Sequence, residues 1–195
     1  YKKYEAPFTI SKPTSLSVYS EKEGVKSSTI GTQFYKIDPN ISIKLETEYA
    51  NQYNAGGNDA LIDGIVGARD FRTGTWQGYF DENLVATVDL GSEKPINIIS
   101  VNFLKDQRSW IFYPIEVECL VSKDGKNFKS IGNFKFEEIT PSDEVDVKKV
   151  EFKLSNSKYR YVKLIAKKLG QLPEWHLGYE HDGRSWLFVD EITIN

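Results

Sequence analysis

Histidine, tryptophan, arginine and acidic side chains crowd into one short stretch near the C-terminus, residues 172–188 (LPEWHLGYEHDGRSWLF). Both histidines of the chain and two of its four tryptophans lie there. The stretch contains Gly178 and Gly183 and follows no regular hydrophobic period, so we expect a loop and not a core strand. Aromatic rings cover the C–H face of a sugar, while histidine, arginine and aspartate bind its hydroxyls. The alternative is a loop whose rings close the end of a core.

The elements that must position this loop are strands. Apolar and polar residues alternate with a period of two over several segments, and short runs of Gly, Pro, Asn and Asp separate these segments. No amphipathic helix of three turns is expected anywhere. The pattern predicts an all-β protein, an antiparallel β-sandwich or jelly roll. We expect its strands over residues 84–91, 96–104, 115–121, 128–136, 147–154, 159–166 and 187–194.

Composition narrows the possible partners. The net charge is −3 and no basic stripe stands out, so nucleic acid is not an expected partner. No apolar stretch approaches the roughly 20 residues of a membrane span, so no membrane insertion is expected. Cys119 is the only cysteine, which excludes an internal disulfide. It alternates with acidic residues in a predicted strand, so we expect it in the core and not as a nucleophile.

The first 36 residues are expected to form a separate N-terminal β segment. Short strands are predicted over residues 7–10, 15–19 and 27–35, too few to close a core of their own. The turn-forming residues 38–40 follow, so we divide the chain into residues 1–36 and 37–195. The chain has no methionine and starts at Tyr1, so we interpret it as a processed or excised part of a longer polypeptide.

Six short motifs occur in an order that resembles a known family. They are residues 60–64 (ALIDG), 74–78 (GTWQG), 88–91 (VDLG), 121–128 (VSKDGKNF), 159–164 (YRYVKL) and 189–192 (VDEI). Their order resembles the discoidin-like, factor V/VIII type C domain, and within it the family 32 carbohydrate-binding modules. The resemblance covers residues 45–195. It implies a discoidin-like jelly roll of the galactose-binding-domain-like type.

A narrower resemblance concerns the parent polypeptide. Residues 53–57 (YNAGG), 103–111 (FLKDQRSWI) and 173–178 (PEWHLG) resemble the module at the C-terminus of bacterial family 20 glycoside hydrolases, the exo-β-N-acetylhexosaminidases. Residues 4–8, 24–28 and 34–36 are similar to the second half of the Ig-like chitobiase C-terminal domain. The resemblance implies that residues 1–36 are the end of that domain. It also implies an upstream catalytic domain in a protein that is secreted, periplasmic or on the cell surface.

The family binds sugars with loops at one end of the sandwich. The resemblance places Phe71, Arg72, Trp76 and Tyr79 in the first loop, residues 106–110 in the second and residues 172–188 in the third. His181 receives no role. We favour a core position for Trp76 and for Trp186, because such rings often close the end of a sandwich, although Trp76 stays a candidate sugar contact. The candidate carbohydrate-binding residues are Trp175, His176, Arg108, Trp110, Asp106 and Trp76.

The resemblance also implies a structural calcium ion. In the family, an aspartate in the early Asp-Gly turn and a glutamate near the last strand hold it together with backbone carbonyls. The matching positions are Asp63, Glu191 and the carbonyl of Ala60. Calcium takes about six to eight oxygen ligands, which a turn can supply. The chain departs from the family at Ile65 and Val66, where acidic ligands often occur, so a loop without metal is the alternative.

These features favour a binding module over an enzyme. The sequence contains no Gly-x-Ser-x-Gly, His-Glu-x-x-His or phosphate-binding loop motif. Its acids alternate with lysines along strands and do not form an evident catalytic pair. The expected function is a non-catalytic module that tethers a glycoside hydrolase to glycans of the amino-sugar or galactose type. The alternative is a structural accessory domain that packs against the catalytic domain without binding sugar.

Overall fold

The computed structural model describes residues 1–8, 10, 14–34 and 38–195. The chain forms two compact units, Tyr1–Asp38 and Pro39–Asn195. The boundary predicted after residue 36 falls within residues 35–37, outside the described part. Among the described residues the only helices are short 3-10 turns, and none is long and apolar enough to span a membrane.

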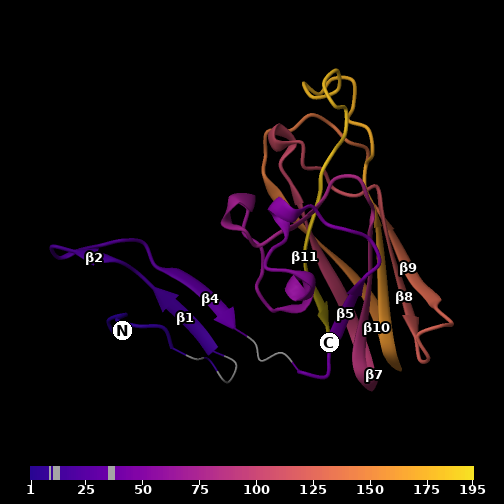
Figure 1. The fold of residues 1–195 in the computed structure, drawn as a ribbon, viewed down its shortest axis with the longest axis horizontal. Helices are drawn as coiled ribbons and strands as arrows, with labels where there is room; N and C mark the ends of the chain where they lie inside the picture. Colours follow the sequence, from indigo (N-terminus) through magenta and orange to yellow (C-terminus); the bar gives the residue numbers. More distant parts are fainter. Residues whose placement is uncertain (9, 11–13, 35–37) are drawn as a thin grey trace. The chain divides into compact units, whose positions relative to one another are not determined.

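Unit 1 consists of two small antiparallel sheets (Figure 1). Strand β1 (Thr14–Val18) pairs with β4 (Ile30–Phe34), and β2 (Glu21–Lys22) pairs with β3 (Val25–Lys26). Pro7, Phe8 and Ile10 lie outside any strand, contrary to expectation, while Thr9 lies outside the described residues. Of residues 1–8, 10, 14–32 and 38, none is buried, so these residues form no core of their own. The Ig-like assignment of this segment stays a prediction.

Unit 2 consists of strands and short 3-10 turns. The elements are β5 (Ser42–Leu45), η1 (Asn51–Tyr53), η2 (Asn58–Ile62), η3 (Phe71–Thr73), β6 (Gln77–Tyr79), β7 (Leu84–Lys105), η4 (Gln107–Ser109), β8 (Glu116–Ser122), β9 (Lys129–Lys135), β10 (Asp146–Lys167) and β11 (Leu187–Ile194). The all-β fold predicted from the alternation is confirmed, and no α-helix occurs among the described residues.

Two of these strands run through both layers of the sandwich. Residues 84–105 form one strand, β7, where the sequence predicted two, and residues 146–167 form β10 in the same way. Both strands bend near the middle, and the register between them shifts there. The pairing of β7 with β10 continues on both sides of the bend, which is why two predicted strands become one.

The two halves of β7 and β10 lie in different layers. One layer contains β5, residues 84–89 of β7, residues 161–167 of β10, β8 and β9. The other contains β6, β11, residues 98–105 of β7 and residues 146–153 of β10. Alternate side chains of both layers, such as Val88 and Val101, enter one buried cluster. Cys119 belongs to this core, as predicted, and burial raises the pKa of its thiol to about 12.

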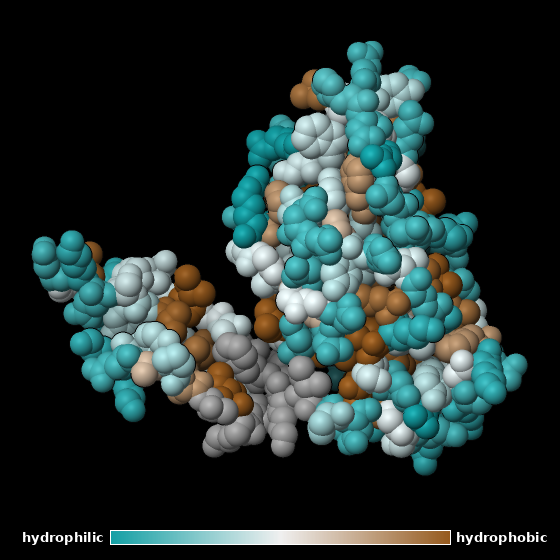
Figure 2. Space-filling view, in the orientation of Figure 1, coloured by the Kyte–Doolittle hydropathy of each residue, from teal (hydrophilic) through white to brown (hydrophobic). Residues whose placement is uncertain are grey.

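The strand ends determine where the loops lie. Because Leu84 and Lys105 end the two halves of a bent strand, they lie at the same end of unit 2, opposite the bend. The connections at residues 106–115, 136–145 and 168–186 all leave strands at that end, which is uppermost in Figure 1. Figure 2 shows that this end is mostly hydrophilic, whereas hydrophobic residues gather lower on the visible face.

Candidate functional site

The third loop, predicted over residues 172–188, corresponds in the structure to residues 168–186, between β10 and β11. It is a compact loop without helix or regular strand. Its base is closed by the backbone N–H of Leu172, which donates to the carbonyl of Gly183 at 2.6 Å, and by that of Ser185, which donates to Gly170 at 3.0 Å. The loop predicted from the glycines and proline is confirmed. Arg184 joins it to a neighbouring turn, since the guanidinium binds Asp182 bidentately and also contacts Asp81. The rest of the loop is therefore held on a defined base.

His176 connects the third loop to the second. Its Nε2 lies 2.7 Å from the backbone carbonyl of Gln107, and its Nδ1 accepts the backbone N–H of Gly178 at 3.0 Å. An Nδ1 that accepts is unprotonated, so the proton is assigned to Nε2, which donates to Gln107. Both ring nitrogens are thus engaged with backbone groups. His176 positions two loops and has no free nitrogen for a sugar hydroxyl, which corrects its predicted role as a hydrogen-bonding contact.

An aromatic cluster surrounds the His176 ring. The rings of Trp110, Phe112 and Trp175 have centroids 5.9, 5.4 and 5.8 Å from that of His176. Trp110 and Trp175 are 40% and 43% exposed, whereas Phe112 is buried. The structure therefore brings two predicted site residues from different loops together, with part of each indole facing solvent.

Trp110 has its position set by backbone geometry and by a glycine. It ends η4 in the left-handed conformation with φ 60°. The chain turns there, so that Ile111 pairs with Asp106. Its indole Nε1 lies where a Cβ on Gly178 would stand, at 1.5 Å from the ideal Cβ position. No side chain fits at position 178 while Trp110 keeps this place. The glycine that indicated a loop is also a packing requirement.

The polar candidates of the second loop behave differently from each other. Arg108 is exposed at the tip of η4 and is available to a ligand. Asp106 is only 8% exposed, and its Oδ2 accepts the hydroxyl of Ser109 at 2.8 Å. Asp106 therefore stabilises its own loop, and its contact with a sugar stays a prediction.

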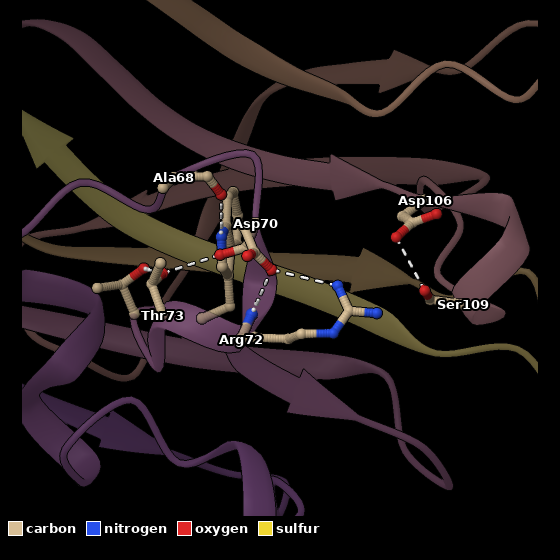
Figure 3. A network of polar contacts seen from close by, with 8 residues as sticks. Ala68, Asp70, Arg72, Thr73, Asp106 and Ser109 are labelled. Atoms are coloured by element: carbon tan, nitrogen blue, oxygen red, sulfur yellow. Dashed lines mark hydrogen bonds and ion pairs between the residues drawn. The ribbon is translucent and has the colours of Figure 1, made fainter. Parts of the chain in front are cut away.

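The first loop approaches the second from the side. The carboxylate of Asp70 accepts the backbone N–H of Arg72 at 3.0 Å and faces its guanidinium at 3.3 Å. In Figure 3 the Arg72 side chain extends from Asp70 toward the Asp106 and Ser109 pair. Both Asp70 and Arg72 are exposed. Arg72 therefore adds a cationic group on this side of the loops.

Trp76 does not belong to this surface. It is 1% exposed, and its Nε1 donates to the carbonyl of Ala68 at 2.7 Å. The ring packs in a second core cluster with Leu104, Ile111 and Phe188. Its predicted sugar contact is wrong, and the core interpretation holds. Tyr79 is also fully buried, while Trp186 is partly buried against the same cluster.

The predicted cation ligands meet beside β11. Asp63 accepts the backbone N–H of Ile65 at 2.7 Å, and Glu191 accepts that of Gly64 at 3.0 Å. Asp190 accepts the N–H of Gly67. Ala60 lies in η2, which packs against β11. Three carboxylates from the start and the end of the unit thus hold one turn.

Burial raises the pKa of all three carboxylates, and their hydrogen bonds from backbone N–H groups offset only part of this effect. Burial, followed by the charge of Asp190, raises the pKa of Glu191 to about 8. Burial likewise raises the pKa of Asp190 to about 7, with Asp63 adding to the effect. A divalent cation would favour the ionised forms of all three. No three acidic, histidine or cysteine side chains of the described residues converge on one point, so backbone carbonyls would have to complete a shell.

Sequence reasoning missed four residues that organise the site. Gln107 and Phe112 connect its loops, Gly178 admits Trp110, and Asp190 adds a third acid beside Glu191. Asp190 had a signal, because it precedes a predicted ligand in a strand. Gln107 and Gly178 fall within loops that the sequence predicts, but their contacts and those of Phe112 could not be predicted, since the partners lie far away in the sequence.

The chain belongs to the F5/8 type C domain family, whose sequence pattern matches residues 42–192. No curated protein sequence matches it.

Solved structures with the same fold share little sequence with the chain. A family 29 fucosidase from Ruminococcus gnavus, in complex with fucose, is 14% identical with a TM-score of 0.53, covering 80% of this chain and 25% of the fucosidase. The GH31 CBM32-2 module bound to GalNAc is 12% identical with a TM-score of 0.51, covering 79% and 97%. A Clostridium perfringens module, CpGH89CBM32-5, is 21% identical with a TM-score of 0.44, covering 77% and 95%.

Proposed function

We propose that unit 2 is a non-catalytic carbohydrate-binding module. The observation that carries the proposal is the meeting of Trp110 and Trp175, half-exposed and from different loops, around a histidine that fixes both loops. Indole faces bind the C–H face of a sugar ring and exclude water from it. The GH31 CBM32-2 module, which has the same fold, binds GalNAc.

The charged residues of the site would orient the sugar. Arg108 and Arg72 are exposed, and each guanidinium can donate several hydrogen bonds to hydroxyl or acetamido oxygens. Arg72 forms an ion pair with Asp70, but both side chains are exposed. Amino sugars and galactose, the expected ligands, present such oxygens around an apolar ring face.

We further propose that the module belongs to a secreted, periplasmic or cell-surface bacterial β-N-acetylhexosaminidase and raises the local concentration of its substrate. The motifs at residues 53–57, 103–111 and 173–178 support this parent. The test compares hydrolysis of a fluorogenic N-acetylglucosaminide by the full polypeptide and by this chain. Activity of the full polypeptide alone is expected. Hydrolysis by this chain would overturn the non-catalytic assignment.

Calorimetric titration of the chain with N-acetylglucosamine, N-acetylgalactosamine and galactose tests sugar binding. At least one of them is expected to bind and to change tryptophan fluorescence. Trp175→Ala and Arg108→Ala should each weaken that binding roughly tenfold, about 1.4 kcal/mol. Tyr4→Ala removes an exposed aromatic residue of unit 1, 70% exposed, and should change nothing.

Absence of heat and of fluorescence change with every sugar, in a folded chain, would exclude the binding function. That result would favour the structural accessory domain, in which the loops contact another part of the polypeptide.

We also propose that Asp63, Asp190 and Glu191 hold a calcium ion with nearby carbonyls, including that of Ala60. The ion would supply positive charge that stabilises the turn at residues 63–67. In its absence, the raised pKa values of Asp190 and Glu191, about 7 and 8, favour their neutral forms. The metal-free fold therefore loses stability as pH rises from the ordinary carboxyl range, about 4, through about 8.

Thermal unfolding with calcium or with EDTA tests the ion at pH 6 and pH 8. Calcium requires ionised ligands, so its stabilisation should be larger at pH 8, roughly 5 °C or more for about 2 kcal/mol. Glu191→Gln should abolish the increase in melting temperature with calcium. In EDTA at pH 8, the melting temperature of this variant should be no lower than that of the unaltered chain. Glu180→Gln, at an exposed position, is the control. An unaltered chain that ignores calcium at pH 8 would contradict the proposal.

A further inference from the structure

A hollow of about 940 Å³ lies next to the loops, between the start of β10 and the segment after β9. Tyr113 and Phe136 line it, with centroids 5.0 Å apart and planes inclined by 30°. Both rings are partly exposed, so each presents some of its surface to the hollow. Small-molecule sites span roughly 300–1,000 Å³, so this hollow has room for more than one sugar ring.

Polar groups surround this aromatic floor. Asp146 accepts the hydroxyl of Tyr113 at 2.8 Å, and Lys105 lies 3.4 Å from the hydroxyl of Ser142 and 5.9 Å from the Tyr113 ring centroid. Hydrogen-bonding groups beside aromatic rings suit the hydroxyls and C–H faces of a sugar.

The charges lining the hollow balance each other. The lining contains three lysines and three carboxylates. The lysines are Lys105, Lys135 and Lys148, and the carboxylates are those of Glu137, Glu138 and Asp146. An anionic ligand would meet as many negative as positive groups. The lining therefore favours a neutral ligand over a phosphate, sulfate or uronate.

Two buried residues, Phe112 and Gln107, lie between the hollow and the tryptophan cluster and contact both. Phe112 lines the hollow and also lies 5.4 Å from the His176 ring and 6.5 Å from that of Trp175. Gln107 binds His176 through its carbonyl, while its side chain donates to the carbonyl of Thr140 at 2.9 Å and accepts the N–H of Ser142 at 2.6 Å. One buried residue thus holds the loops on both sides.

We propose that this surface binds a neutral oligosaccharide chain of at least two units and not a single sugar. One unit lies against Trp110 and Trp175, and the next unit lies in the hollow over Tyr113 and Phe136. This inference rests on the proposed sugar-binding function and assigns a second subsite to it.

The test uses calorimetry on the full chain. N-acetylglucosamine, N-acetylgalactosamine and galactose are each compared with their β-linked oligosaccharides of two to four units. The oligosaccharide of the sugar that binds should bind roughly tenfold more tightly than the monosaccharide, since a second contact adds to the first. Monosaccharide affinity reports the tryptophan cluster alone.

Two variants address the hollow separately. Thr140 is exposed in its lining, and Thr140→Trp should fill the hollow, while its carbonyl, which binds Gln107, is unchanged. This variant should lose the tenfold gain and keep its monosaccharide affinity. Lys148→Ala should lower oligosaccharide affinity roughly threefold, by the loss of one hydrogen-bonding cation. Thr32→Trp and Lys153→Ala, at exposed positions outside the lining, are the matched controls.

The outcomes separate the two proposals. If a monosaccharide binds and its oligosaccharides bind no more tightly, the second subsite is overturned while the sugar-binding function stands. If oligosaccharides bind more tightly but both hollow variants behave as the unaltered chain, the additional units lie elsewhere, and the subsite is again overturned. If no sugar binds, the sugar-binding function itself fails.

Discussion

Single residues at the loops divide into those that face solvent and those that hold the others in place. Trp175, Trp110 and Arg108 are exposed, whereas His176 has both nitrogens engaged with Gln107 and Gly178. In the proposed binding module, such a histidine would keep two aromatic rings at a fixed separation. Loss of such preorganisation weakens binding without removing any direct contact.

Gly178→Ala should disturb the site more than an ordinary loop substitution. The added methyl group would stand 1.5 Å from Nε1 of Trp110, so the indole or the third loop must move. We expect a loss of about 1–3 kcal/mol in unfolding free energy, as for an overpacked site, with a changed tryptophan emission spectrum. Chemical denaturation followed by fluorescence measures both. Gly31→Ala, where the nearest atom lies at 3.7 Å, is the control; equal stability of the two variants would contradict the packing argument.

At the scale of elements, the bends of β7 and β10 connect the two layers of the sandwich. The guanidinium of Arg160 donates to both oxygens of Asp89, at 2.8 and 2.9 Å, and holds the pKa of that carboxyl below its usual range. Asp89 also accepts the backbone N–H of Gly91 at 2.8 Å. Gly91 has φ 76°, and an added Cβ would lie 2.8 Å from the carbonyl oxygen of Asn40. The bend therefore requires glycine for both conformation and space.

Gly91→Ala should lower the free energy of unfolding by about 1–3 kcal/mol, because alanine is strained at this φ and meets a backbone atom. Urea denaturation followed by circular dichroism measures the change. Ser92→Ala, at the exposed neighbouring position, should stay within about 0.5 kcal/mol of the unaltered chain. If the glycine variant were as stable as the serine variant, the bend would not be constrained as described.

At the scale of the whole molecule, the two units differ in how they are stabilised. Both buried clusters draw all their residues from unit 2, and the family pattern lies within residues 42–192. Of residues 1–8, 10, 14–32 and 38 in unit 1, none is buried. A domain with its own core folds independently.

Residues 39–195 alone should therefore fold cooperatively, with a melting temperature within about 2 °C of the full chain, a difference of less than 1 kcal/mol in a protein of this size. They should also bind the same sugar with the same affinity. Calorimetric scanning and titration of both chains measure this. A fragment that fails to fold, or unfolds much earlier, would show that unit 1 supplies stability to unit 2.

The sequence by itself determined the all-β class, the inward position of Cys119 and the family. Alternation along a strand is a local pattern, so Cys119 could be assigned to the core without knowing its partners. The six family motifs, from residues 60–64 to residues 189–192, are also local patterns, because each lies at a turn or in a strand. Even so, two pairs of predicted strands became the single strands β7 and β10, because pairing across a bend depends on the neighbouring strand.

Only the tertiary structure decided which aromatic residues face solvent. Trp76 and Trp110 are both candidate sugar contacts by sequence, yet one fills a core cluster and the other is 40% exposed. Their exposure depends on segments far away in the chain, such as Ala68 and Phe188 for Trp76 and Gly178 for Trp110. The same holds for Gln107, whose partners His176 and Ser142 belong to other loops. Loop residues have no periodic pattern that reports burial, so their roles follow from packing between loops that the strands bring to one end.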